Sequence, residues 1–215
     1  MGSPPFFFEW ASRLLPWLFP ISFLILMIGL VWGIGFAPSD YKQGDVYRII
    51  FVHVPSAILG QSIYLMMAIF GSICLIWRAK LAGMFLRSAA PLGASFTLIA
   101  LISGAVWGKP TWGTWWVWDA RLTSELILLF IYIGHILISN SFDDFEKGDR
   151  NAAILTLIGI INLPIIKWSV DWWNTLHQPA SIKLSGTSTI HSSMLMPLLL
   201  MFFVFILYCA LIFLM

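Results

Sequence analysis

The chain has 215 residues, of which 60% are apolar and 10% are charged, and its formal net charge is +2. This composition excludes an ordinary soluble globular protein and is typical of an integral membrane protein. We therefore expect membrane lipid among its contacts and no nucleic acid.

Apolar runs long enough to cross a membrane occur six times along the sequence. A hydrocarbon core of about 30 Å requires about 20 mostly apolar residues in helical form. Polar or Pro/Gly-rich breaks separate the runs, which almost fill the chain. We predict an all-α integral membrane protein, a single domain over 1–215 built as a bundle of six transmembrane helices. The expected spans lie near 17–37, 50–77, 84–106, 122–140, 152–168 and 191–214.

Two stretches bear on the boundaries of these spans. The first apolar run is about 20 residues long, which exceeds the apolar core of a signal peptide, and we interpret it as a true span. The charged run DDFEKGDR at 143–150 cannot cross lipid at a tolerable cost. We expect that run to be a solvated loop.

An even number of spans places both termini on one side of the membrane. The loops at 38–49, 107–121 and 169–190 then share the opposite side. Lys and Arg residues are divided six to six between the two sides, so the positive-inside rule does not orient the chain. Some basic residues on the loop side are therefore candidates for binding a ligand.

Tryptophan is concentrated in the loop at 107–121. Belts of residues at the membrane interface are also rich in tryptophan. Such a belt explains two or three tryptophans, but not five that are followed by the charged pair Asp119 and Arg121. We interpret the cluster as a platform for a flat aromatic ligand. If the segment is helical, Trp112, Trp115 and Trp116 share one face, because they stand at positions i, i+3 and i+4. The tryptophans are Trp107, Trp112, Trp115, Trp116 and Trp118.

Two histidines flank this cluster and share its side of the membrane. His53 begins the second span, and His177 lies in the last loop. A single histidine near a helix end is more often structural, but two neutral imidazoles can fill both axial positions of a haem. We predict these two as haem-iron ligands. His191, at the start of the sixth span, is a reserve ligand or a polar helix start, and His135 is expected to pack inside the bundle.

Haem also carries two propionates, which favour arginine because the planar guanidinium binds carboxylates bidentately. Arg48 and Arg121 are the candidates. Arg48 has a competing interpretation as an interfacial anchor, and Arg121 could instead form a salt bridge with Asp119 or Glu125. Asp119 either orients a ligand or caps the fourth span.

Both cysteines of the chain, Cys74 and Cys209, fall within predicted spans, and no CxxC or CxxCH pattern is present. The chain should therefore not attach haem covalently. A haem bound here would be haem b, held transiently and without a covalent bond.

Three motifs resemble those of a known family. The segment WGTWWVWDARLTSELILL at 112–129 resembles the tryptophan-rich "WWD" signature of haem-handling proteins in cytochrome c biogenesis. The motifs VHVPSA at 52–57 and WWNTLHQ at 172–178, together with six spans, are similar to the CcmC family in particular.

This resemblance implies axial haem ligation by His53 and His177, with the segment from Trp112 to Asp119 as the haem platform. It also implies periplasmic loops and cytoplasmic termini in a bacterial inner membrane, or in the mitochondrial inner membrane for an organelle-encoded relative. The implied partners are a CcmA-type ATPase, CcmB-type and CcmD-type membrane subunits, and the haem chaperone CcmE. The chain itself has no Walker A pattern, so any ATP-driven step must come from a partner. We expect this chain to be a haem-binding and transfer subunit and not an enzyme.

The predicted function is haem binding at the periplasmic face and delivery to the CcmE-type chaperone, as a membrane subunit of an ABC-type haem export complex. One alternative is a membrane b-type cytochrome, although such carriers place their ligands deep within the spans. The other alternative is a transporter of a small aromatic solute, which would typically have repeat symmetry. The sparse charges within the spans indicate no polar path, which favours lateral or external loading of haem.

Overall fold

A computed structural model describes residues 4–177 and 190–215, and these are almost entirely helical. A single isolated bridge between Asp40 and Gly44 closes the first loop of the described chain. The helices are α1 (Pro4–Leu30), the π-helical η1 (Val31–Phe36), the 3-10 helix η2 (Asp45–Ile49), α2 (Ile50–Trp77), α3 (Lys80–Trp112), α4 (Ala120–Asn140), α5 (Phe145–Gly159), α6 (Asn162–Trp172) and α7 (Ser192–Leu214).

Six helical stretches of the described residues are long and apolar enough to cross a membrane, which confirms the predicted fold class. Two of these stretches combine neighbouring helices: α1 continues into η1, and α5 and α6 together form the fifth span. The stretches are Phe8–Phe36, Asp45–Trp77, Lys80–Trp112, Ala120–Asn140, Phe145–Trp172 and Ser192–Leu214.

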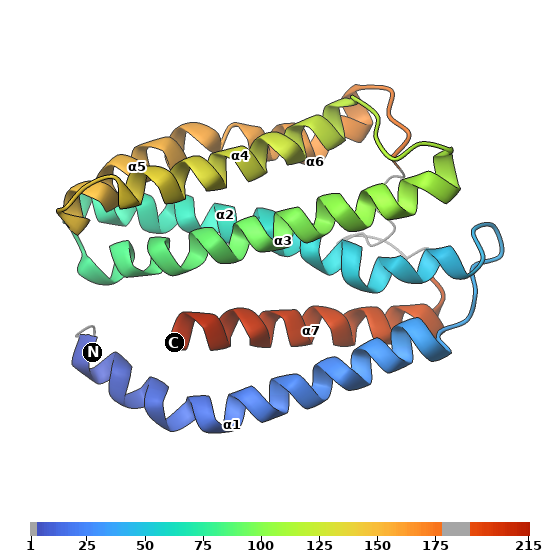
Figure 1. Cartoon of the computed structure of the whole chain (residues 1–215), viewed down its shortest axis with the longest axis horizontal. Helices are drawn as coiled ribbons and strands as arrows, with labels where there is room; N and C mark the ends of the chain where they lie inside the picture. The colour runs from blue at the N-terminus through green and yellow to red at the C-terminus, as the bar shows by residue number, and fades with distance from the viewer. Residues whose placement is uncertain (1–3, 178–189) are drawn as a thin grey trace.

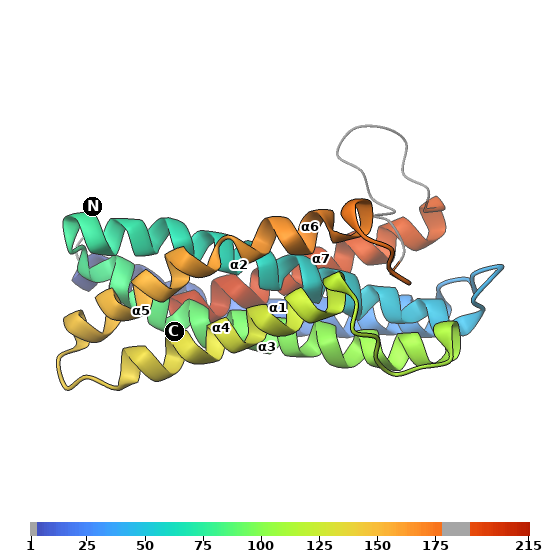
Figure 2. The ribbon, with the colours of Figure 1, turned by 90° about the horizontal axis from the view of Figure 1, so that it is seen from above.

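The helices run lengthwise beside one another, and the described ends of α1 and α7 lie at the same end of the bundle (Figures 1 and 2). In Figure 1, α1 packs against α7, α2 against α3, and α4 against α5 and α6. The connections after η1 and α3, and the described residues 173–177 that follow α6, lie at the opposite end. We call these the terminal end and the loop end of the bundle.

The prediction of a solvated loop at 143–150 is wrong for most of this stretch, because α5 already begins at Phe145. The Asp144 carboxylate caps this helix by accepting from the backbone N–H of Glu146 at 2.9 Å. Asp149 is buried and pairs with Arg87 of α3 at 2.6 Å. The charges therefore enter the helix because capping and an ion pair compensate them.

The first and fifth spans also differ from the sequence prediction. The helix of the first span starts well before residue 17. Glu9 and Arg13 belong to it and form an ion pair at i, i+4. The fifth span is interrupted between Gly159 and Asn162. Pro164 explains this break, since its ring clashes with the carbonyl four residues earlier and it has no N–H to donate there.

A tightly packed core joins α2, α3, α4 and α5 in the middle of the bundle. The hydroxyl of Tyr132 donates to the carbonyl of Gly60 at 2.7 Å, and that of Tyr64 donates to the carbonyl of Thr156 at 2.9 Å. Both tyrosines are fully buried and meet edge to face at 5.2 Å between ring centroids. This core fixes the helices whose loop ends form the site.

Candidate functional site

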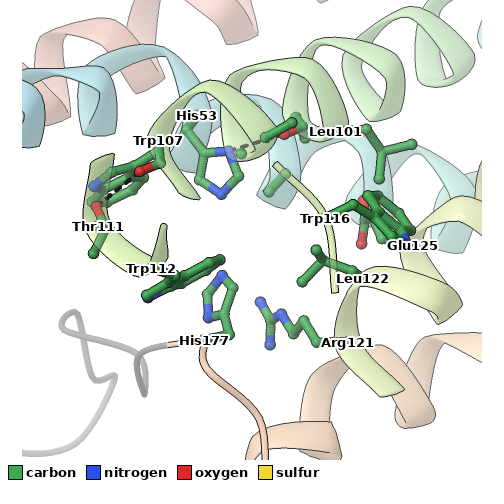
Figure 3. A pocket seen from close by; sticks show the side chains of 14 residues that line it. His53, Leu101, Trp107, Thr111, Trp112, Trp116, Arg121, Leu122, Glu125 and His177 are labelled. Atoms are coloured by element: carbon green, nitrogen blue, oxygen red, sulfur yellow. Dashed lines mark hydrogen bonds between the residues drawn. The ribbon is translucent and has the colours of Figure 1, made fainter. Parts of the chain in front are cut away.

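A cleft opens at the loop end, between α2, α3, α4 and the segment that follows α6. It holds about 720 Å³ of empty space, a volume that includes its open mouth. Most of its wall is apolar or aromatic. Small residues of α2 and α3 give it room, while the titratable lining residues converge from three separate elements (Figure 3). These lining residues include His53, Ala57, Ala100, Gly104, Trp107, Trp112, Trp116, Arg121, Glu125 and His177.

The backbone of α3 fixes the orientation of His53. Its Nδ1 lies 3.0 Å from the carbonyl oxygen of Ala100 and 3.0 Å from Oγ of Ser103. A carbonyl can only accept, so Nδ1 carries the proton and Nε2 keeps its lone pair for another partner. A Cβ on Gly104 would come within 3.0 Å of the His53 ring, so glycine makes room for the imidazole.

The second predicted ligand faces the first. The ring centroids of His53 and His177 are 6.4 Å apart and their planes differ by 36°. An imidazole nitrogen binds a transition metal at about 2 Å, so two trans ligands of one metal ion have centroids roughly 6 Å apart. The distance between these two rings therefore matches the distance expected between two axial ligands of one metal ion.

A chain of contacts holds the segment that carries His177. The hydroxyl of Thr175 accepts from the backbone N–H of His177 at 3.1 Å and donates to the carboxylate of Asp119. The other carboxylate oxygen of Asp119 caps α4 by accepting from the backbone N–H of Leu122 at 2.8 Å. Asp119 thus caps the fourth span and also tethers the segment that carries His177.

The tryptophans do not share a helical face. The helix α3 ends at Trp112, because Gly113 turns the chain with a positive φ of 81°. Trp112 and Trp116 line the cleft, as does Trp107. Trp115 and Trp118 are 56% and 76% exposed and lie outside its lining.

The two predicted arginines have different positions. Arg121 lines the cleft and donates to the carbonyl of Ile166 at 3.1 Å. Within the described residues, it forms no ion pair with Asp119 or Glu125. Arg48 lies outside the cleft lining, where it donates to the carbonyl of Ile34 at 3.1 Å and contacts Asp45 at 3.4 Å.

The other two histidines have structural contacts. His135 is fully buried, and its Nδ1 lies 2.7 Å from Oγ1 of Thr156. His191 caps α7 by accepting from the backbone N–H of Ser193 at 3.3 Å. Neither residue lines the cleft.

Glu125 is the cleft residue that sequence reasoning did not place there. It is 8% exposed, and its Oε2 lies 3.4 Å from Nε2 of Gln61. The i+4 spacing from Arg121 was a usable signal, because that spacing puts both side chains on the same face of α4. From the sequence alone, Glu125 was expected only as a salt-bridge partner of Arg121.

The described residues contain no group of three or more His, Cys, Asp or Glu side chains that could hold a bare metal ion. Two facing imidazoles among aromatic walls instead fit a flat ligand that brings its own metal. A guanidinium beside them fits carboxylates on that ligand.

Comparison with known proteins is consistent with this geometry. A family model described as Heme exporter protein C matches residues 1–215. The chain belongs to that family. The Heme exporter protein C of Escherichia coli K12 is 53% identical over 178 residues, covering 83% of this chain and 73% of the relative.

Other members of the Heme exporter protein C family are similarly close. The protein of that name from Bradyrhizobium diazoefficiens is 48% identical over 94% of this chain and 76% of its own length. A putative cytochrome c biosynthesis ccmC-like mitochondrial protein from Marchantia polymorpha is 49% identical over 92% of this chain and 84% of its own length. The relatives of this chain therefore include one whose name describes it as mitochondrial.

Proposed function

We propose that this protein binds haem b in the cleft at the loop end and passes it on during the biogenesis of c-type cytochromes. The facing pair of His53 and His177, 6.4 Å apart between ring centroids, carries this proposal. Haem is the cargo of this reaction, and the two imidazoles are the proposed axial ligands of its iron. Family membership and the name of the mitochondrial relative support the same assignment.

The surrounding side chains support a porphyrin rather than a small solute. Trp107 meets the His53 ring edge to face at 5.5 Å, and Trp112 lies 6.3 Å from the His177 ring. Aromatic walls at these positions can cover the faces of a porphyrin. Arg121 supplies a guanidinium for a propionate, whereas Arg48 is oriented by protein contacts outside the cleft.

Transient, non-covalent binding is consistent with the remaining chemistry. Cys74 and Cys209 are buried in α2 and α7 and do not line the cleft, so no thiol there can bond to a haem vinyl group. One proposed ligand, His177, belongs to a segment outside the helices, where movement requires less disruption than within a packed span. Binding and release at this site require no catalytic group.

We place the loop end at the periplasmic face of the inner membrane and the terminal end in the cytoplasm. Trp115 and Trp118 are exposed next to the cleft and provide an apolar contact for a CcmE-type haem chaperone. A CcmA-type ATPase would act from the cytoplasmic side, together with CcmB-type and CcmD-type membrane subunits. In an organelle, the corresponding location is the mitochondrial inner membrane.

Absorption spectra of the purified protein test the proposal, with each variant expressed beside the haem chaperone. We expect His53→Ala and His177→Ala to lose the six-coordinate haem spectrum and haem transfer, whereas His135→Ala keeps both. Haem that persists without both cleft histidines, or that disappears only with His135→Ala, would overturn the assignment. Haem that stays permanently bound and is never transferred would instead indicate a b-type cytochrome.

A further inference from the structure

The inner part of the cleft contains two buried polar atoms that have no hydrogen-bond partner among the described residues. One is Oε1 of Glu125, and the other is Nε1 of Trp116. Both side chains line the cleft, and Figure 3 shows them on the same side of it, away from His177. Buried polar atoms normally have partners, so two unpartnered atoms in one cleft point to a polar group of a ligand.

The hydrogen bonds of Gln61 define how Glu125 can act. The Gln61 amide nitrogen donates to the carbonyl of Ala57 at 3.2 Å and to Oε2 of Glu125 at 3.4 Å. Oε2 is therefore an acceptor, which leaves Oε1 as the oxygen that can carry a proton. With no cation within ion-pair distance among the described residues, a carboxyl that is 8% exposed is less costly as the neutral acid than as an anion.

Two hydrogen-bond donors then lie on one side of the cleft, the protonated Oε1 of Glu125 and the indole N–H of Trp116. The guanidinium of Arg121 also lines the cleft. Glu125 lies one helical turn deeper in α4 than Arg121, because α4 runs from the loop end towards the terminal end. A set of donors at the inner end of an apolar cleft is complementary to a carboxylate.

We propose that Glu125 and Trp116 form a carboxyl-binding subsite, in which Glu125 is the neutral acid and donates a hydrogen bond from Oε1 to a carboxylate of the bound porphyrin. This inference rests on the proposed haem-binding function and adds a pH dependence to it. When Glu125 loses its proton, it becomes an anion facing an anion, and haem binding weakens. The haem affinity should therefore fall as the pH rises.

The other charged or titratable groups around Glu125 come from three elements. The segment after α6 contributes His177, and α2 contributes His53. Arg121 of α4 keeps its charge throughout, and Tyr132 of α4 donates its proton to a backbone carbonyl. The lining residues from α3 are apolar, aromatic or Thr111, and α6 reaches the site through a backbone carbonyl.

The test is a haem titration of the full chain in lipid nanodiscs, followed by the Soret absorbance from about pH 6 to about pH 10. We expect the wild-type affinity to fall by up to about tenfold per pH unit on the alkaline side, the limit for one linked proton. Glu125→Gln keeps a donor of the same shape, so its affinity should stay flat over the same range. Glu146→Gln, at the start of α5 and at the other end of the bundle, is the control and should follow the wild type.

Haem dimethyl ester provides a second measurement that does not depend on any variant. It retains the iron and its axial chemistry but has no ionisable carboxylate, so its affinity for the wild type should not fall on the alkaline side. The inference is overturned if Glu125→Gln follows the wild-type profile, or if the ester shows the same fall as haem. The proposed function fails separately, if haem binding does not require His53 and His177.

Discussion

His53 and His135 are anchored in the same way but lie in opposite surroundings. In each case Nδ1 lies near one backbone carbonyl and one hydroxyl, at 3.0 Å and 3.0 Å for His53 and at 3.2 Å and 2.7 Å for His135. The ring of His53 lines a cleft across from His177, whereas His135 is fully buried in packed side chains. A hydrogen-bonded histidine is therefore not enough to indicate a ligand site; the space beside its second nitrogen decides.

The two ends of the bundle also differ in whether their buried polar groups have partners within the protein. At the terminal end, Arg87 pairs with Asp149 and also donates to the carbonyls of Ser139 and Phe145 at 3.0 and 3.3 Å. At the loop end, one carboxylate oxygen of Glu125 and the indole nitrogen of Trp116 have no hydrogen-bond partner among the described residues. Arg87 and Asp149 stabilise the packing of the helices, whereas these two atoms in the cleft are available to a ligand.

Removing the ion pair at the terminal end should have the largest effect. We expect Arg87→Ala to lower the free energy of unfolding by about 3 kcal/mol, the lower end of the range for a broken buried pair, because the arginine is 24% exposed. Denaturant unfolding in detergent measures this change in the free energy of unfolding. Arg13→Ala removes an ion pair whose side chains are 71% and 61% exposed and should change stability by less than about 1 kcal/mol. Equal effects of the two variants would contradict this distinction between the ends.

Cutting the tether of the His177 segment should have a smaller and more selective effect. Thr175→Val keeps the cap on α4 but removes the contact with Asp119, so haem affinity should fall while stability is unchanged. Asp119→Ala should lower haem affinity as well and also cost about 1 kcal/mol of stability through the lost cap. Haem titration and denaturant unfolding of both variants separate the two roles. A Thr175→Val variant with unchanged haem affinity would show that the tether does not position His177.

The hydroxyls beside the two anchored histidines allow the finest comparison. Ser103→Ala leaves the Ala100 carbonyl as a partner for His53, so haem affinity should fall by about tenfold or less with no loss of stability. Thr156→Val removes the matching hydroxyl from His135 and should instead cost about 1 kcal/mol of stability with haem binding unchanged. Haem titration and denaturant unfolding of both variants test these two expectations. If both variants lose haem affinity, the two histidines do not differ in role as their surroundings indicate.

Hydropathy was sufficient to predict the six spans, because lipid requires long apolar helices regardless of how they pack. Motif position also placed His53 and His177 on one side of the membrane, where the structure brings them together. The shared face of the tryptophans depended on a helix through Gly113, and that condition is not met because α3 ends at Trp112. A single residue with positive φ was enough to redirect the chain.

Other features depend on contacts that spacing does not reveal. The run at 143–150 looks like a solvated loop until Arg87, more than 50 residues earlier in the sequence, is seen to pair with Asp149. Glu125 looks like a brace for Arg121 until its neighbours across the cleft are known. In both cases the partner comes from another helix, so only the packed bundle identifies it.

Because the described ends of α1 and α7 share the end of the bundle opposite the cleft, either terminus offers an attachment point that leaves the cleft uncovered. A tag, a fluorescent fusion or a linker to a sensor surface placed there would sit at the end of the bundle opposite the cleft. An immobilised protein would then present its ligand-binding end to the solution. This makes the molecule well suited to single-molecule and surface-based tests of the proposed haem binding.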